Sequence, residues 1–265
     1  MTSVVIDNRQ INLVQNNSAS RTFNEHIIAF AGTSNAVFRC FQAAERITKL
    51  VIEALKYAGS TSVVFCQTLA SRLLVAWTST SILRLPDVTT KAVKALNDLK
   101  GNENQAPSYL ARKAVKAVHD TAEAASMWGY SISFVLNSAG WKTAADVPDL
   151  IANSTDLQMS AQDWHVATQT AKQAAVQNSP AEVKEAIVHT QRNAFIRMMK
   201  AACSVAGGVL GLSFIAFGAP LLPAVVLITI SLSATLLAMT SHFYQETCPY
   251  KMVDFFENRN VKALV

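Results

Sequence analysis

The amino-acid sequence predicts an all-α protein, a helical bundle followed by a two-helix transmembrane hairpin. Residues 201–241 carry no charged side chain, although the chain contains 23 Lys and Arg and 18 Asp and Glu. Residues 23–200 are rich in Ala, Leu, Lys, Glu and Gln, which favour helices. These two observations divide the chain into a polar N-terminal tail (1–22), a cytosolic bundle (23–200), a membrane hairpin (201–241) and a polar C-terminal tail (242–265).

The N-terminal segment MTSVVIDNRQINLVQNNSASRTFNEH is rich in Asn, Gln, Ser and Thr. It has no apolar run of the length found in a cleavable secretory signal, so we expect no ordinary signal-peptide export. Such a composition is typical of a disordered or loosely ordered tail, and a non-cleaved secretion signal is one use of such a tail.

Helical periodicity and helix-breaking residues divide the first part of the bundle. Gly59 can close the first helix with a positive φ, and Pro86 can stop the second because proline lacks an amide hydrogen. The expected helices cover residues 35–58, 63–85, 88–100 and about 108–139.

The second part of the bundle begins with an expected connector, KTAADVPDLIANSTD, residues 142–156. Helix start signals follow at Ser160 and at Ser179, where Ser179 is a candidate N-cap, Pro180 lies in the first turn and Glu182 is the capping-box partner. We expect the helix that begins near Ser179 to continue without a break into the membrane.

Two bundle segments are more apolar than a surface helix usually is. Residues 62–83 contain one charge, Arg72, and residues 127–141 contain none. The first segment is long enough to be an additional span, but Arg72 near its centre would cost about 2.5–3.5 kcal/mol on insertion scales. We expect both segments to be core helices, with embedding in the membrane interface as the alternative.

The length of the uncharged segment predicts a hairpin. As one straight helix, residues 201–241 would be roughly 60 Å long, about twice the ~30 Å hydrocarbon core of a bilayer. A central break leaves two spans, residues 201–217 and 221–241, each about as long as a membrane helix needs to be. We expect these spans in place of a buried soluble hairpin, because apolar runs of this length are typical of membrane helices.

Glycine and proline residues give the hairpin its expected turn and packing. Gly218, Pro220 and Pro223 are expected to end the first helix, turn the chain and start the second. Gly207 and Gly211 form a G-x-x-x-G on the first span. This motif lets helix backbones approach closely, either between the two spans or between copies of the chain in a homo-oligomer.

Basic residues around the hairpin predict its orientation. Arg192, Arg197 and Lys200 precede the first span, His242 and Lys251 follow the second, and the turn is uncharged. Lys and Arg remain preferentially on the cytosolic side of a membrane, so both termini are expected in the cytosol.

No constellation of residues indicates catalysis, and we expect no enzyme, no cofactor and no metal. The sequence has no G-x-S-x-G, no phosphate-binding glycine loop and no H-E-x-x-H, and its histidines fall at no metal-ligand spacing. The four cysteines form no C-x-x-C pair, which indicates unpaired thiols. Basic residues within 84–118 favour an anionic lipid surface or a solvated helix face. A nucleic-acid partner is not expected, because these residues are not interleaved with an aromatic platform.

The two uncharged lobes, residues 201–217 and 221–241, separated by the turn GAPLLP, resemble the bilobed hydrophobic domain of chlamydial inclusion membrane proteins. The polar start MTSVVIDNRQINLVQNN is similar to the uncleaved type III secretion signal of that family. The resemblance is architectural, because the family shares the lobes and not a residue motif. It implies a secreted bacterial effector in the membrane of a host vacuole, the inclusion, with both termini in the host cytosol and a soluble part that recruits host factors.

A fainter resemblance concerns residues 38–55 and 79–96, which are similar to the helical parts of peroxisomal membrane-elongating peroxins. It implies an alternative function, membrane remodelling by amphipathic helices that act directly on lipid. The expected function is a membrane-anchored interaction protein. Its expected partners are membrane lipid and a host cytosolic protein of unknown identity, with a homo-oligomer left open.

Overall fold

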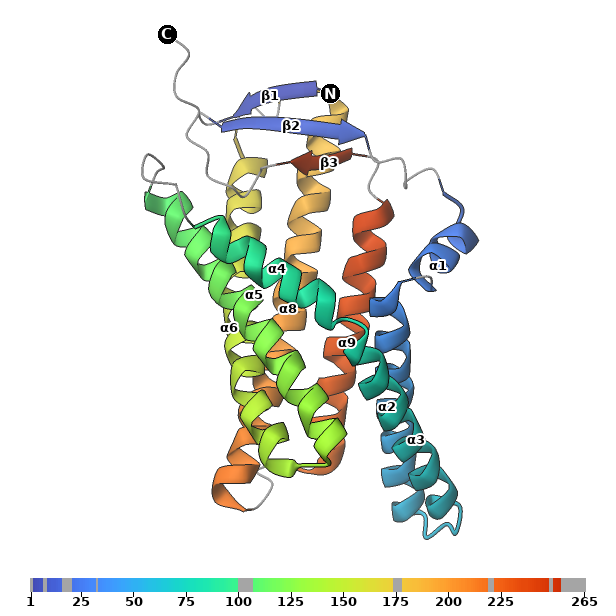
Figure 1. Ribbon diagram of the computed structural model, residues 1–265. Coiled ribbons are helices and arrows are strands. Elements are labelled where there is room, and N and C mark those ends of the chain that lie inside the picture. Colours follow the sequence, from blue (N-terminus) through green and yellow to red (C-terminus); the bar gives the residue numbers. More distant parts are fainter. Residues whose placement is uncertain are drawn as a thin grey trace.

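The computed structural model describes residues 2–6, 9–15, 21–31, 33–99, 107–173, 178–218, 222–247 and 250–253. These residues form eight helices and one small sheet (Figure 1), and the predicted helical bundle followed by two apolar helices is confirmed. The helices are α1 (Phe23–Ala31), α2 (Ser34–Tyr57), α3 (Val63–Ile82), α4 (Leu85–Asn97), α5 (Pro107–Leu136), α6 (Ala139–Ala171), α8 (Ala181–Phe217) and α9 (Ala224–Thr247).

The small sheet joins the two ends of the chain, and the sequence did not predict it. β1 (Thr2–Ile6) pairs antiparallel with β2 (Arg9–Gln15), which pairs antiparallel with β3 (Tyr250–Val253). The expectation of an N-terminal tail without regular structure is therefore wrong for these residues. The run Val4-Val5-Ile6 and the alternation in QINLVQ favour strands, but the Asn- and Gln-rich composition outweighed this signal in the prediction.

The predicted end of a helix before Gly59 is confirmed, but the predicted role of Pro86 is wrong. Gly59 follows α2 with a φ of 65°, as expected of a residue that closes a helix. Pro86 does not stop a helix over 63–85, because α4 begins at Leu85 and Pro86 lies in its first turn. Amide hydrogens have no intrahelical partner in a first turn, so proline loses nothing there.

The expected connector is instead part of α6, which runs continuously from Ala139 to Ala171 with Pro148 inside it. Ser160 is thus an interior residue of α6 and not a helix start. The face of α6 that carries Ala145 and Ala152 is buried against neighbouring helices. Tertiary packing of such a face supplies most of a helix's stability and outweighs local turn propensity.

The helices are arranged as hairpins that point the same way. α6 packs between α5 and α8, α3 packs on α2, α4 packs on α5, and α9 packs on both α8 and α2. The turns between α2 and α3, α5 and α6, and α8 and α9 all lie at one end of the molecule, here named the hairpin end (Figure 1). The sheet lies at the opposite end, here named the sheet end.

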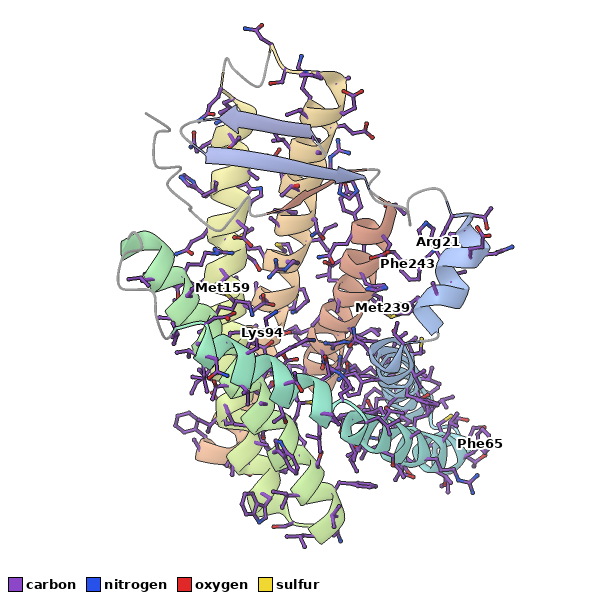
Figure 2. All side chains as sticks on the ribbon, turned by 45° about the horizontal axis from the view of Figure 1, so that its top comes forward. Arg21, Phe65, Lys94, Met159, Met239 and Phe243 are labelled. Atoms are coloured by element: carbon purple, nitrogen blue, oxygen red, sulfur yellow. The ribbon has the colours of Figure 1, made fainter. Side chains whose placement is uncertain are left out.

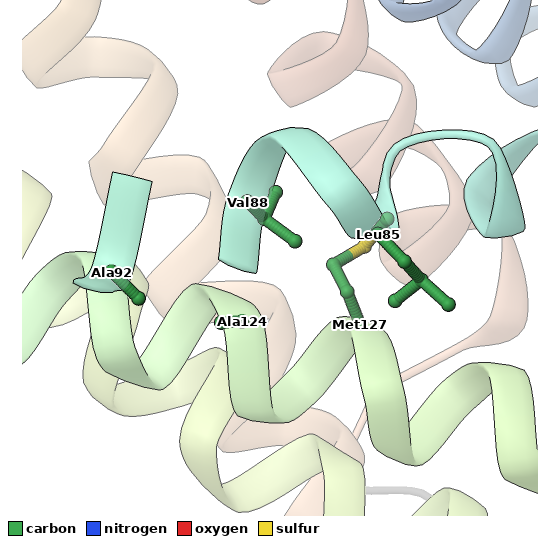
Figure 3. Close-up of a cluster of buried hydrophobic side chains, with 5 residues drawn as sticks. All are labelled: Leu85, Val88, Ala92, Ala124 and Met127. Atoms are coloured by element: carbon green, nitrogen blue, oxygen red, sulfur yellow. The ribbon is translucent and has the colours of Figure 1, made fainter. Parts of the chain in front are cut away.

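The interior is built mainly from small side chains, which let the helices approach closely. One buried cluster joins α4 to α5 and contains Leu85, Val88, Ala92, Ala124 and Met127 (Figure 3). The apolar face of α4 is therefore occupied by α5, and its charged residues face outward.

Neither of the two unusually apolar bundle segments is a core helix along its whole length. α3 buries only Ala70, Thr78 and Ser81. Within 127–141, Met127 is buried, whereas residues 134–136 are exposed. An apolar composition predicts that a helix is shielded from water. It does not predict whether protein or lipid covers that helix.

Candidate functional site: the apolar hairpin and its attachment

α8 and α9 are the described helices that are long and apolar enough to cross a membrane. In the most apolar 18-residue stretch of each helix, 6% of the residues of α8 and 17% of those of α9 are buried. A hairpin in the core of a soluble protein would be mostly covered by other residues. The uncovered apolar surface therefore favours a membrane over a soluble core as its surroundings.

The turn between these helices uses glycine and proline in the predicted way. Gly218 ends α8 with a φ of 68°, and its N–H donates to the carbonyl of Phe214 at 2.9 Å. This left-handed conformation would strain a residue with a Cβ atom. Pro223 immediately precedes α9, and its carbonyl accepts the N–H of Val226 at 2.9 Å. Pro220 lies outside the described residues.

The glycines of α8 face different neighbours. A Cβ atom on Gly207 would lie 3.9 Å from Ile230 of α9, whereas one on Gly211 would meet nothing within 4 Å. A Cβ atom on Gly208 would lie 3.2 Å from Leu150 of α6. The predicted G-x-x-x-G therefore supplies one close contact to α9, and Gly208, which the prediction missed, supplies the contact to α6.

Two of the three basic residues before the first span are paired with acidic residues of α6. Arg197 lies 3.1 Å from Asp156 and 3.5 Å from Asp163, and Lys200 lies 2.6 Å from Asp156. Both aspartates are buried, whereas Arg192 is exposed. Arg197 and Lys200 thus fix α8 to α6, and the sequence prediction that they flank the membrane missed these partners.

The two aspartates have different protonation behaviour. Burial by itself would raise the pKa of Asp156, but Lys200 and Arg197 outweigh it and hold this pKa well below its usual range. Burial raises the pKa of Asp163, even though Arg112 of α5 and Arg197 contact it. Asp156 is therefore an ionised partner at any physiological pH, and the cluster links α5, α6 and α8.

A second polar contact joins α2 to the middle of α9. The Arg46 guanidinium donates to the main-chain carbonyl of Ser231 and to the Thr235 hydroxyl, which in turn donates to Gln42 Oε1 at 3.3 Å. Burial lowers the pKa of Arg46 to about 10, so it remains cationic at neutral pH. Cations near membrane helices contact protein partners in this way, because lipid acyl chains offer no hydrogen-bond acceptors.

Aromatic and polar contacts hold α9 near the sheet end. The rings of His189 and Tyr244 are stacked with centroids 3.8 Å apart, and Ser241 donates to Asn193 at 3.0 Å. Burial lowers the pKa of His189, which favours the neutral ring. His242, expected to follow the second span, lies against Phe30 of α1 with ring centroids 4.9 Å apart.

Among the described residues, His119, Asp120 and Glu123 place ligand atoms within 4.8 Å of one another, a grouping that the sequence prediction missed. Each has a protein partner. His119 Nδ1 lies 2.8 Å from the Ala152 carbonyl, while Asp120 pairs with Lys116 and Glu123 with Arg84. Lys116 and Arg84 therefore already offset the charge of the two carboxylates in this grouping.

No family model, curated protein or solved structure matches the chain.

Proposed function

We propose that this chain is a membrane-anchored interaction protein, in which α8 and α9 cross a membrane as a hairpin and the helical bundle binds a cytosolic partner. The observation that carries the proposal is the change along α8 at Lys200. Before this residue the helix is fixed to α6 by ion pairs, and after it no charge occurs up to Phe217 and almost all residues are half-buried or exposed. Such a helix passes from a protein environment into an apolar one.

The sheet supports an arrangement with both termini on one side of the membrane. β1 and β2 at the start of the chain pair with β3, which follows α9. A two-span hairpin returns the chain to the side from which it started, so this pairing can persist while the hairpin is inserted. The exposed Arg192 favours the cytosol as that side.

A candidate surface for the cytosolic partner is the uncovered face of α1, which lies toward the sheet end, away from the turn of the apolar hairpin (Figure 1). Phe23 and Ile27 lie one turn apart on this helix and are 74% and 41% exposed. Exposed apolar side chains that lie side by side often mark a protein interface.

We further propose that the membrane is that of a host vacuole and that the chain is a type III secreted bacterial effector. This part rests on the resemblance of the two lobes and of the polar start to inclusion membrane proteins. It is tested by expressing a tagged chain in a bacterium with a type III system. Detection of the tag in the host vacuole membrane would support this proposal. Retention of the tagged chain in a bacterium whose secretion system is intact would contradict it.

The partner surface is tested with two matched double variants of the full chain in membranes. Phe23→Asp with Ile27→Asp places two charges on the apolar face, and Asn24→Asp with Ala29→Asp places them at exposed positions on other sides of the same helix. We expect proximity labelling of a specific cytosolic protein to be lost in the first pair and kept in the second. Equal labelling by both pairs would exclude α1 as the partner surface.

The alternative proposal, direct membrane remodelling, is supported by the exposed face of α3, which lies at the hairpin end, where lipid can cover it (Figure 1). Val64, Phe65 and Leu69 on this face are 69%, 72% and 39% exposed, and Phe65 points away from the other helices (Figure 2). The apolar face of α4 is a weaker candidate, because Leu85, Val88 and Ala92 are buried against α5. If the chain remodels membranes, the full chain should tubulate anionic liposomes without any partner protein. Liposomes that keep their shape at saturating bound protein would exclude remodelling.

A further inference from the structure

The turn between α5 and α6 lies within an uncharged segment. The last charged residue of α5 is Glu123 and the first of α6 is Lys142, so residues 124–141 contain none. The turn itself is tight, with Asn137 at a φ of 47°. We name residues 127–141 the α5–α6 tip.

The α5–α6 tip lies at about the same level as the turn of the apolar hairpin. Leu150 of α6 lies beside Gly208 of α8. From this contact α6 extends eleven residues back to its start at Ala139, about 16 Å, and α8 extends nine residues onward to its end at Phe217, about 14 Å. Both turns lie at the hairpin end (Figure 1).

Bulky apolar side chains are exposed around this turn. Phe134, Val135, Leu136 and Trp141 are 38%, 72%, 61% and 46% exposed. Turns between helices of soluble bundles usually carry small and polar residues, because water surrounds them. Phe214 and Phe217 at the end of α8 are exposed in the same part of the molecule.

Three polar side chains of the α5–α6 tip donate hydrogen bonds within the protein. Tyr130 donates its hydroxyl hydrogen to Asp146 at 2.6 Å, and Ser133 donates to the main-chain carbonyl of Ser138 at 2.8 Å. Ser131 donates to a main-chain carbonyl one turn earlier, at 2.8 Å. Polar groups of helices in lipid need hydrogen-bond partners within the protein, because water cannot supply them there.

The other flanking hairpin does not share this pattern. α2 carries Lys49, Glu53 and Lys56 in its last three turns, directly before the α2–α3 turn. Charges at that spacing would be costly in a bilayer. A long uncharged run is therefore present at the α5–α6 turn and not at the α2–α3 turn.

We propose that the α5–α6 tip enters the lipid bilayer together with the α8–α9 hairpin, so that four helices form the membrane anchor. This inference rests on the membrane insertion of α8 and α9 proposed above. Lipid is the occupant that fits, because the exposed tip continues the uncovered apolar surface of α8 at the same level. Lys142 directly follows the tip, and its long side chain can reach the headgroup layer.

The test places an environment-sensitive fluorophore at single cysteines of the full chain reconstituted in phosphatidylcholine vesicles, after serine replaces the four native cysteines. Val135→Cys reports on the tip, Val225→Cys on the apolar hairpin, and Glu182→Cys, exposed at the sheet end, is the control outside the membrane. Spin-labelled lipids quench the fluorophore only where acyl chains surround it. We expect quenching at Val135 within about twofold of that at Val225, and none at Glu182.

The outcomes separate the inference from the proposed function. Quenching at Val225 without quenching at Val135 would overturn the four-helix anchor and leave the two-helix anchor intact. No quenching at either position would remove the proposed membrane insertion itself. If the cysteine-free chain does not fold, the native tryptophans serve: quenching by brominated lipid should fall on Trp141→Phe, and an unchanged value would also overturn the inference.

Discussion

The first half of α8, residues 181–200, and its second half, residues 201–217, belong to one unbroken helix but differ in what covers them. The first half buries Val183, Ala186 and Ile187 and forms ion pairs to α6 through its last turn. In the second half only Ala201, at its start, is buried, and Val209 and Phe214 are 46% and 48% exposed. Backbone geometry therefore does not separate bundle from anchor, and the boundary is set by which side chains have protein partners.

One helix of 37 residues with no proline inside therefore connects the bundle directly to the apolar hairpin. Variants in its two halves should accordingly separate what stabilises the bundle from what inserts into the membrane.

Removing the carboxylate that holds the first half of α8 should have the largest effect. Asp156→Ala leaves Arg197 and Lys200 half-buried without their main acidic partner. We expect the free energy of unfolding in detergent to fall by about 3–5 kcal/mol, as for other broken buried ion pairs. Asp87→Ala, which breaks an exposed pair with Lys91, should cost less than about 1 kcal/mol. Equal losses for the two variants would show that the α6–α8 pairs do not hold the helix.

A charge on the uncovered half of α8 should affect membrane insertion and not the bundle. Val209→Asp should weaken insertion by about 2.5–3.5 kcal/mol, because Val209 lies at the centre of the 201–217 span and the carboxylate has to enter the hydrocarbon core. Val188→Asp, at a similarly exposed position of the first half, should leave insertion unchanged. The measurement is the fraction of chain that resists alkaline extraction from membranes. Loss of resistance in both variants would indicate a general folding defect.

Leucine in place of Gly208 or Gly211 should show which face of residues 201–217 is covered by protein. Gly208→Leu has to displace Leu150 and should cost about 1–3 kcal/mol of stability in detergent, as overpacking does. Gly211→Leu meets open space and should be neutral or gain up to about 1 kcal/mol from helix propensity. Denaturation of both variants measures the difference in their free energies of unfolding. If Gly211→Leu were the destabilising variant, α6 or a second copy of the chain would have to cover the side of α8 that carries Gly211.

The smallest effect concerns pH. Burial and the nearby Asp146 raise the pKa of Asp149 from 3.8 to about 6, against the opposing influence of Arg39 and Lys200. The folded chain therefore binds a proton more tightly than the unfolded chain, so this group's contribution to stability is lost as the pH rises from about 4 to 6. Asp149→Asn should increase stability at pH 7 by on the order of 1 kcal/mol and flatten this pH dependence. A lower stability at pH 7 would show that the ionised carboxylate is needed.

The features that a single stretch of sequence encodes were predictable. The missing charges of residues 201–241 predicted two apolar helices, and Gly218 ends the first of them in the left-handed conformation expected there. The continuation of the helix from near Ser179 into the apolar segment is confirmed as well.

The features that depend on distant residues were not predictable. Asp156 lies 41 residues before Arg197, inside a stretch that local propensity assigns to a connector, and nothing near it indicates a partner. Likewise, spacing alone cannot tell that Gly208 faces α6, whereas Gly207 and Gly211, one turn apart on another side of α8, do not. Pairing of β2 with β3 joins segments more than 200 residues apart.

The measurement that tests the two-span topology most directly is protease protection of the full chain in intact, sealed membranes. Epitope tags are placed at the N-terminus, at the C-terminus and within the 218–223 turn. The account predicts that protease on the cytosolic side removes both terminal tags and spares the turn tag until the membrane is permeabilised. Protection of one terminal tag and not the other, or removal of the turn tag from the cytosolic side, would contradict a hairpin that crosses the membrane.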